Sequence, residues 1–195
     1  MAWSKNGACL GVGYGKVDHT SWCEHQSIVS VWNIFRNDHD EKKPTVTIEV
    51  SNCVTSLAYH PDNPQVLAGG TMNGEIFIWD TNEDSKTPVI QKSEPDEYFH
   101  REAINELEWL KVEHANNSVS YFLVSISTDG KVLMWYNPQK SLKFPVKGHM
   151  LVQTKVYAGD LESHQYLGGS SMNLVKGFYG QNESALLIGT YGGQV

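Results

Sequence analysis

Three side chains in the third quarter of the chain have the types needed for hydrolytic chemistry. An imidazole held by a carboxylate can take the proton of a serine hydroxyl, which then attacks an acyl carbon. His100, Asp129 and Ser127 could fill these three roles. The reaction also needs an exposed hydroxyl and an oxyanion hole, and the sequence contains no nucleophile-elbow motif. We therefore predict that the chain is not an enzyme, and keep a hydrolase as an alternative.

A second group of residues has the types that bind metals. Asp18, His19, Cys23 and His25 are close together in sequence, and Cys53 lies further along. Zinc sites favour C-x2–4-C or H-x3–5-H pairs, and the spacing from His19 to His25 is not a common version. The simpler interpretation is a polar loop with a half-buried cysteine, so no metal site is predicted.

Three glycines in GVGYG (11–15) raise the question of a nucleotide-binding loop. A third glycine at the required spacing, a following helix and a GK[ST] triplet are all missing from the sequence. We interpret these residues as turn and packing glycines. The sequence therefore predicts no cofactor and no small-molecule substrate.

Charge and composition disfavour several classes of partner. The net charge of −7, without a Lys/Arg run, argues against binding nucleic acid or an anionic membrane surface. The longest apolar runs are too short to span a bilayer, so no membrane insertion is predicted. The three cysteines lack C-x-x-C spacing and no secretory signal is seen, which indicates a reducing, soluble compartment.

The elements that must position these residues are short, and they recur. A nearly continuous apolar run indicates a strand that is covered on both faces. Three such runs end in tryptophan, at Trp32, Trp79 and Trp135, which are 47 and 56 residues apart. The runs are SIVSVWN (27–33), EIFIWDT (75–81) and KVLMWYN (131–137).

Strands of small residues precede these runs. AGGTMNG (68–74) and SISTDG (125–130) each lead into a turn, where Asn-Gly and Asp-Gly predict two-residue hairpins. Outer strands are expected to follow each run, within TVTIEV (45–50), TPVIQK (87–92) and FPVKG (144–148). Strand, tight turn, strand and outer strand therefore recur in order.

A third recurring element carries an aromatic anchor upstream of each pair of strands. Tyr59 precedes Thr71 by twelve positions, and Phe178 precedes Thr190 by the same number. Equal offsets are expected of repeated units. The four anchors are Trp3, Tyr59, Trp109 and Phe178.

Four-stranded units with a period of roughly 40–45 residues are the signature of a WD40-type β-propeller. We therefore predict the fold class as all-β, with the chain forming a single partial propeller of about three blades plus part of a fourth. The predicted blade units are 1–50, 51–98, 99–148 and 149–195. This number of units is below that of a closed propeller, so we expect a fragment or a truncated product.

Polar insertions between the strands should be surface loops, and three aromatic residues lie in them. Trp22, Tyr98 and Phe99 are candidate interface anchors. The alternative, in which these rings fold back over the blade edge, stays equally open because sequence does not give exposure. The stretch 97–110 has a helix-compatible composition, but its second half matches VTSLAY (54–59) and is predicted to be a strand.

The best-preserved unit resembles a WD repeat. His100, Ile104, Leu107 and Trp109 have the spacing of the opening His-x3-V-x2-L-x-F, and 127–135 matches the closing S-x-D-x-x-V-x-x-W. In that family a His, a turn Asp, a Ser or Thr and the Trp form a hydrogen-bonded network within one blade. The resemblance assigns these roles to His100, Asp129, Ser125 or Ser127, and Trp135.

The other units carry the same pattern with departures. Asn73 stands where the turn Asp is expected, and Val50 stands where the leading His would fall, so the network should be incomplete there. The remaining structural positions of the repeat are Trp32, Trp79 and Asp80.

The match extends to the WD-repeat dynein intermediate chain family, and most of all to the smaller intermediate chains of cytoplasmic dynein-2. It is carried by the blocks 13–33, 68–80, 123–135 and 185–193. The resemblance implies a non-catalytic subunit that binds the dynein heavy chain and other dynein-2 subunits, with light chains bound by the full-length protein.

Such a subunit would act in microtubule-based retrograde intraflagellar transport and cilium assembly. It would be found in the cytoplasm, cytoskeleton and cilium, at the axoneme or basal body. Two other WD-repeat scaffolds remain as alternatives, an axonemal dynein intermediate chain and a substrate adaptor of a ubiquitin ligase.

Overall fold

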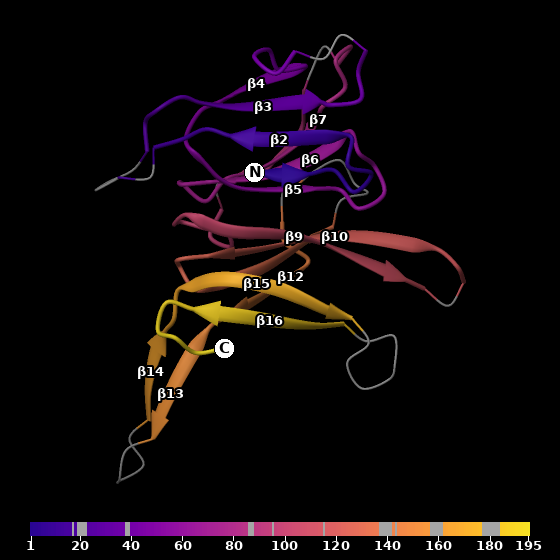
Figure 1. The fold of residues 1–195 in the computed structure, drawn as a ribbon. Helices are drawn as coiled ribbons and strands as arrows, with labels where there is room; N and C mark the ends of the chain where they lie inside the picture. The colour runs from indigo at the N-terminus through magenta and orange to yellow at the C-terminus, as the bar shows by residue number, and fades with distance from the viewer. Residues whose placement is uncertain are drawn as a thin grey trace.

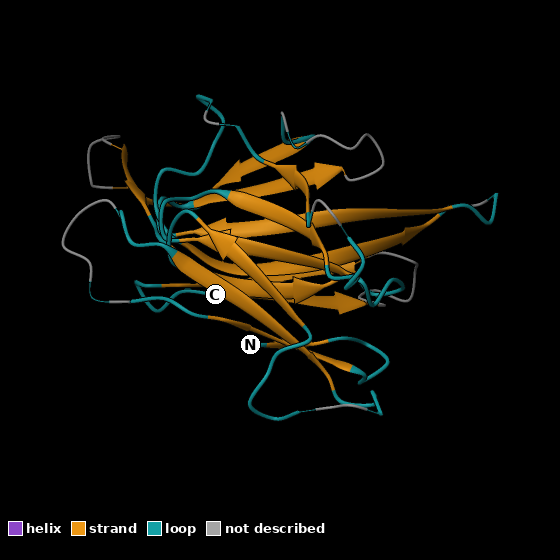
Figure 2. Cartoon of the chain, turned by 90° about the horizontal axis from the view of Figure 1, so that it is seen from above, coloured by secondary structure: helices purple, strands orange, loops and turns teal. Residues whose placement is uncertain are grey.

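The computed structural model describes residues 1–16, 18, 23–37, 40–85, 88–94, 96–114, 116–136, 142, 144–156, 162–176 and 184–195. All regular structure in these ranges is β-strand, and no helix occurs among them (Figure 2). The described part of the chain therefore also holds no helix that could cross a membrane. The predicted all-β class is confirmed.

The first sheet is an antiparallel meander in the order β1-β2-β3-β4. In β4 the side chains alternate, with Ile48 and Val50 buried and Thr47 and Glu49 exposed, as a strand with one covered face requires. The four strands are β1 (Ala2–Trp3), β2 (Cys9–Gly13), β3 (Ser27–Asn33) and β4 (Val46–Val50).

The second sheet repeats this order as β5-β6-β7-β8. Its strand β7 is buried from Ile76 to Trp79, because sheets cover it on both sides. The outer strand lies within the predicted segment 87–92. The strands are β5 (Val54–Tyr59), β6 (Val66–Thr71), β7 (Ile76–Asp80) and β8 (Val89–Lys92).

The third sheet has the same topology, β9-β10-β11-β12 from inner to outer strand. Its first strand occupies the second half of the stretch 97–110, as predicted from its match to 54–59. The strands are β9 (Ile104–Glu113), β10 (Val119–Ser127), β11 (Lys131–Tyr136) and β12 (Lys147–Met150).

The rest of the chain forms two hairpins. Strands β13 (Val152–Val156) and β14 (Glu162–Tyr166) pair in a hairpin that the sequence pattern did not predict, and it projects away from the stacked sheets (Figure 1). Strands β15 (Gly169–Lys176) and β16 (Ser184–Thr190) form the second hairpin, in which β15 lies against β9 and β10. The division into the four predicted units stays a prediction, and β12 extends two residues beyond the predicted boundary at 148/149.

Register identifies equivalent residues in the sheets. Tyr59 lies opposite Leu67 in the second sheet, and Trp109 lies opposite Leu123 in the third. The same place in the last hairpin is held by Leu174, opposite Leu186, and not by the predicted anchor Phe178, which lies outside the described residues. The twelve-residue offset was therefore misleading, because the loops between paired strands differ in length.

The sheets stack face to face, and the core lies between them (Figure 1). One apolar cluster joins the first and second sheets through Val29, Ile48, Leu67 and Trp79. A second cluster joins the second and third sheets, and a third joins the third sheet to β15 through Ile126 and Met172. This arrangement explains the near-continuous apolar strands, because inner strands touch a neighbouring sheet on each side.

The tight turns differ from the predicted two-residue hairpins. Gly130 N–H donates to Ser127 O at 3.1 Å, and Gly74 N–H donates to Thr71 O at 3.1 Å. Within these two turns the left-handed residues are the glycines alone, Gly74 at φ +81° and Gly130 at φ +79°. A type I′ hairpin needs two such residues, so each connection is a three-residue loop that ends in a left-handed glycine.

Candidate functional site

The third sheet holds a buried polar network that starts at His100. The imidazole Nε2 lies 2.7 Å from Ser125 Oγ, and Nδ1 lies 3.3 Å from Asp129 Oδ1. The indole Nε1–H of Trp135 donates to the same Ser125 Oγ at 2.9 Å. His100, Ser125 and Trp135 are each at most 1% exposed. Four side chains from β10, β11 and the two flanking turns are thereby joined.

The donors in this network follow one direction. An indole can only donate, so Ser125 Oγ accepts from Trp135 and keeps its own hydrogen for His100. The carboxylate of Asp129 can only accept, so His100 Nδ1 carries the ring hydrogen and Nε2 accepts from Ser125. All polar atoms are satisfied with a neutral imidazole.

Electrostatics agree with this assignment. Burial lowers the pKa of His100 below its ordinary value, and the hydrogen bond to Asp129 offsets only part of that shift. Burial alone would raise the pKa of Asp129, but its hydrogen bond with His100 and the N–H groups of Lys131 and Arg101 bring the pKa below its ordinary value. Asp129 is therefore an anion that ties the turn to the strand entering the sheet.

The order Ser125–His100–Asp129 is that of a hydrolytic triad, yet the hydroxyl is closed to a substrate. Ser125 is 0% exposed, and its oxygen already contacts both an imidazole and an indole. The predicted participant Ser127 is placed elsewhere. Its hydroxyl donates to Glu102 O at 3.1 Å and accepts the N–H of Asp129 at 3.2 Å, so it shapes the turn. The network stabilises the blade.

The equivalent turn in the second sheet binds a different segment. Asn73 Oδ1 accepts the N–H of Cys23 at 2.9 Å, and Asn73 Nδ2 donates to Cys23 O at 2.9 Å. No aspartate could make the second bond, since an ionised carboxylate only accepts. Asn73 is 4% exposed, so it fixes the backbone of Cys23, in the connection between β2 and β3, from the buried side.

The other tryptophans of the repeat lack the partner that Trp135 has. The indole N–H groups of Trp79 and Trp32 have no hydrogen-bond partner among the described residues. Gly69 occupies the place of Ser125, opposite Phe77 as Ser125 is opposite Leu133. Asp80, at the end of β7, is half-buried and accepts the N–H of Asn82 at 2.9 Å.

The candidate interface aromatics behave differently from one another. Tyr98 is 57% exposed, whereas Phe99 is 6% exposed and packs edge-on against Trp135 at 6.4 Å between ring centroids. Of the two alternatives left open for Phe99, the structure supports the folded-back ring and not the surface anchor, because the ring is part of the core of the third sheet. Trp22 lies outside the described residues.

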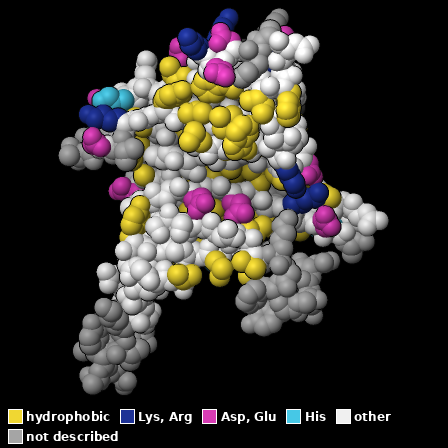
Figure 3. Space-filling model, viewed as in Figure 1, with side chains coloured by type: hydrophobic (Ala, Val, Ile, Leu, Met, Phe, Trp, Pro, Cys, Tyr) yellow, Lys and Arg dark blue, Asp and Glu magenta, His cyan; other side chains and the backbone are white. Residues whose placement is uncertain are grey.

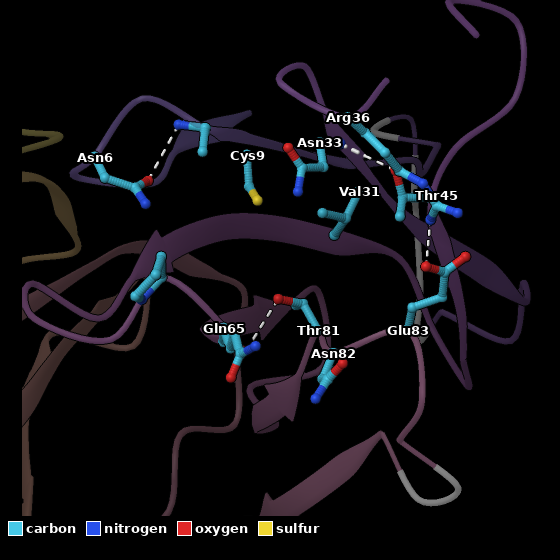
Figure 4. Close-up of a pocket in the computed structure, with 12 residues that line it drawn as sticks. Asn6, Cys9, Val31, Asn33, Arg36, Thr45, Gln65, Thr81, Asn82 and Glu83 are labelled. Atoms are coloured by element: carbon cyan, nitrogen blue, oxygen red, sulfur yellow. Dashed lines mark hydrogen bonds and ion pairs between the residues drawn. The ribbon is translucent and has the colours of Figure 1, made fainter. Parts of the chain in front are cut away.

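Two cavities lie beside the sheets. One, of about 450 Å³, is next to β12 and is lined by the exposed side chains of Tyr98, Phe144, Val146 and Met150. The other, of about 310 Å³, lies between the first and second sheets and is lined mainly by polar groups (Figure 4). An ion pair of Arg36 with Glu83 spans part of it. Neither lining contains an accessible serine or cysteine paired with a histidine.

The residues considered for a metal are only partly brought together. Cys23 and Cys53 meet, but within the described ranges no third cysteine, histidine or acid joins them to form a metal-binding group. His19 lies outside those ranges. Gly11 and Gly13 pack against the first strand of the second sheet, where a Cβ on Gly13 would lie 2.8 Å from Val54. Close sheet packing accounts for them.

Comparison with known proteins identifies the repeat. Residues 42–80 match the family model described as "WD domain, G-beta repeat". Among solved structures, Sqt1 from Chaetomium thermophilum aligns over 98% of this chain and 43% of that chain, with a TM-score of 0.59 and 18% identity. A chain of the mitotic checkpoint complex aligns over 84% of this chain and 44% of its own, with a TM-score of 0.52 and 18% identity. The predicted partial WD40-type β-propeller is confirmed.

Three curated relatives to which the chain is similar are all dynein intermediate chains. Cytoplasmic dynein 2 intermediate chain 2 of Homo sapiens is 31% identical over 69% of this chain and 25% of its own. Dynein axonemal intermediate chain 4 of Danio rerio is 26% identical over 100% of this chain and 24% of its own. Cytoplasmic dynein 1 intermediate chain of Drosophila melanogaster is 29% identical over 69% of this chain and 19% of its own. The chain spans about a quarter of the length of the first of these relatives.

Proposed function

This chain is a WD-repeat protein of the dynein intermediate chain family, and from that premise we propose that it is a non-catalytic subunit of a dynein-2 type motor. In this role it binds the dynein heavy chain and helps the motor assemble for retrograde intraflagellar transport and cilium assembly. Light chains would bind outside the present residues. ATP hydrolysis and microtubule binding would belong to the heavy chain.

The observation that carries the proposal is the similarity to dynein-2 intermediate chain 2 from two mammals. The human and mouse proteins are each 31% identical to this chain over the same 135-residue length. The closed Ser125–His100–Asp129 network supports a binding role, because it provides rigidity without an accessible nucleophile.

Exposed apolar side chains offer places for a protein partner. Tyr98, Phe144 and Val146 are 57%, 63% and 57% exposed and lie together around the cavity next to β12. Further hydrophobic side chains gather on the face shown in Figure 3, in the region that the first sheet occupies in Figure 1. Large exposed aromatic and aliphatic groups are the usual anchors of protein interfaces.

A second candidate is an axonemal dynein intermediate chain. Similarity to the zebrafish axonemal protein extends over 100% of this chain, including the last hairpins, whereas the alignment with the human dynein-2 protein covers 69%. The two candidates share the heavy-chain partner class and differ in which heavy chain is bound.

Affinity purification from ciliated cells tests both. A tagged form of the chain is expected to recover the dynein-2 heavy chain, and recovery of an axonemal heavy chain instead would favour the second candidate. Recovery of ubiquitin-ligase subunits without any dynein heavy chain would contradict both.

Matched variants locate the contact. If the surface next to β12 binds the heavy chain, the double variant Tyr98→Ala/Phe144→Ala should lower its recovery at least about tenfold, since anchor residues each contribute ~1–2 kcal/mol. Tyr166→Ala is the control, because Tyr166 is 67% exposed on the projecting hairpin. Equal recovery by both variants would exclude this surface and leave the partner assignment intact.

A further inference from the structure

Two buried thiols from distant parts of the sequence meet at the junction of the first and second sheets. Cys53 N–H donates to Cys23 Sγ at 3.4 Å, and the two side chains are in hydrogen-bonding contact. Each cysteine is 2% exposed. The third cysteine, Cys9, lies at the opposite end of β2 from Gly15 and Lys16, which adjoin the pair.

The backbones that carry the two thiols are both fixed by the turn of the second sheet. Asn73 binds the N–H and the carbonyl of Cys23, and Met72 N–H donates to Cys53 O at 2.9 Å. Gly15 packs so closely that a Cβ there would lie 3.0 Å from Cys53 Cβ. The pair is therefore held in place before any reaction occurs.

The surroundings distinguish the two sulfurs. Burial alone would raise the pKa of Cys23, but hydrogen bonds from the N–H and side chain of Cys53 bring it below its ordinary value. Burial raises the pKa of Cys53, although Lys16 N–H donates to its Sγ at 3.2 Å. Cys23 is therefore the sulfur that more readily becomes a thiolate, and Cys53 supplies the hydrogen bond to it.

A metal does not explain the pair as well as sulfur chemistry does. A structural zinc site needs four ligands, and no third residue of a ligating type joins the two thiols within the described part of the chain. Among the described residues, the sulfurs also make hydrogen bonds with the backbone groups Lys16 N–H and His25 O. Two adjacent thiols without further ligands are suited to forming a bond with each other.

We propose that Cys23 and Cys53 are a thiol-oxidation site, at which a hydroperoxide such as hydrogen peroxide forms a disulfide between the first and second sheets. The Cys23 thiolate attacks one peroxide oxygen, the O–O bond breaks, and the departing hydroxide takes a proton to become water. Cys53 then attacks the sulfenic sulfur of Cys23, the S–S bond forms, and its thiol proton leaves with the hydroxyl as a second water. Two thiols are oxidised and one peroxide is reduced.

The oxidant has a short path to the pair. Lys16, Glu24 and His25 are exposed and flank the two buried residues in sequence and space, so the thiols lie one layer beneath the surface. The disulfide would close a loop between positions 30 residues apart. It would add a covalent link where the reduced chain is held by hydrogen bonds, from Asn73 to Cys23 and from Cys53 N–H to Cys23 Sγ. This inference does not depend on the proposed function.

The test treats the folded 195-residue chain with millimolar hydrogen peroxide, and maps peptides by mass spectrometry without reduction. We expect a Cys23–Cys53 cross-link, a free Cys9, and reversal by dithiothreitol. Closing such a loop should raise the melting temperature by about 5 °C or more, and dithiothreitol should remove the rise. Failure of the folded chain to form this link, or linkage to Cys9 at a similar rate, would overturn the proposal.

Three variants give the test its controls. Cys9→Ser should cross-link like the unmodified chain. Cys53→Ser should form no link and should leave a sulfenic acid at Cys23 that dimedone traps. Asn73→Asp loses the bond to Cys23 O and should slow cross-linking about threefold or more, with the folded state checked by circular dichroism. In Cys23→Ser, dimedone should trap little sulfenic acid at Cys53. Trapping there at the same rate as at Cys23 in Cys53→Ser would contradict the assigned roles of the two sulfurs.

Discussion

The second and third sheets have the same backbone and different polar interiors. In both, a buried tryptophan lies opposite a leucine of the preceding strand, Trp79 with Leu67 and Trp135 with Leu123. In both, the turn before that strand ends in a left-handed glycine. In the third sheet the indole binds Ser125, whereas Trp79 has no hydrogen-bond partner among the described residues.

Gly69 accounts for the difference between the two tryptophans. A Cβ on Gly69 would lie 2.3 Å from the Trp79 ring, so the indole occupies the space of a side chain at this position. Phe77 lies parallel to Trp79, at 5.5 Å between ring centroids, and adds apolar contact. In the second sheet the tryptophan is thus held by ring packing without a hydrogen bond to its indole N–H among the described residues, and the turn residue Asn73 binds Cys23. The two sheets therefore share their backbone geometry and differ in the side chains that surround the buried tryptophan.

The largest expected effect tests what the two sheets share. Trp135→Ala and Trp79→Ala should each lower the free energy of unfolding by about 3–5 kcal/mol, because both rings are at most 1% exposed and leave a cavity. Urea denaturation followed by circular dichroism measures both. A cost below ~1 kcal/mol for Trp79→Ala would show that the second sheet does not depend on its ring, contrary to the packing argument.

The second prediction separates the two turns. Asp129→Ala should cost about 3 kcal/mol, because it leaves His100 Nδ1–H and the N–H groups of Arg101 and Lys131 without their acceptor. Asn73→Ala should cost about half as much, roughly 1–2 kcal/mol, since it removes two bonds to one backbone. The measurement is again urea denaturation. Equal costs would mean that the network gives the third sheet no additional stability.

The third prediction concerns an attempt to convert one sheet into the other. Gly69→Ser places a hydroxyl where Trp79 lacks a partner, yet we expect a loss of about 2 kcal/mol, since the added Cβ meets the ring. Ser125→Gly is the matched change in the third sheet, and it should also destabilise, by removing the acceptor of Trp135. A stabilised Gly69→Ser chain would contradict the account of the Trp79 position.

Much of this architecture could be predicted from the sequence because its signals are local. The apolar runs ending at Trp32, Trp79 and Trp135 reflect strands covered on both faces, and they mark β3, β7 and β11. The role of Asn73 could not be predicted, because its partner Cys23 is 50 residues away in an insertion. Alignment of the repeat units shows that Asn73 stands in place of the turn aspartate. It does not show that the asparagine binds the backbone of Cys23.

Other differences follow from geometry that a linear pattern does not contain. Ser125 and Ser127 are both buried, and what selects Ser125 is its register opposite Leu133, which brings its hydroxyl to the Trp135 indole. Tyr98 and Phe99 are adjacent, yet one is exposed and the other buried, so membership of a loop did not settle exposure.

The last prediction uses pH. The polar network of the third sheet contains a histidine, His100, whereas the bonds of Asn73 in the second sheet involve no titratable side chain. The unfolded chain protonates His100 near pH 6.5, while burial keeps the folded pKa of His100 lower. Between these values the unfolded state binds more protons, so stability is complete above pH 6.5 and falls as the pH decreases, by up to about 1.4 kcal/mol per pH unit. The lowered pKa of Asp129 extends the loss only below about pH 4.

Three variants show which side chain causes the dependence of stability on pH. Urea denaturation between pH 7 and pH 5 measures this slope. His100→Gln should reduce the slope by the share that belongs to His100, since the substituted side chain does not titrate. Asn73→Ala should lower stability by the same amount at every pH, because the second turn has no titrating group in its bonds. His60→Gln serves as a further control, since burial also lowers the pKa of His60 and part of the slope belongs to it. An unchanged slope in His100→Gln would mean that His100 titrates alike in the folded and unfolded chain. The directed chain of donors from Trp135 to Asp129 would then be wrong, because it requires an imidazole that stays neutral.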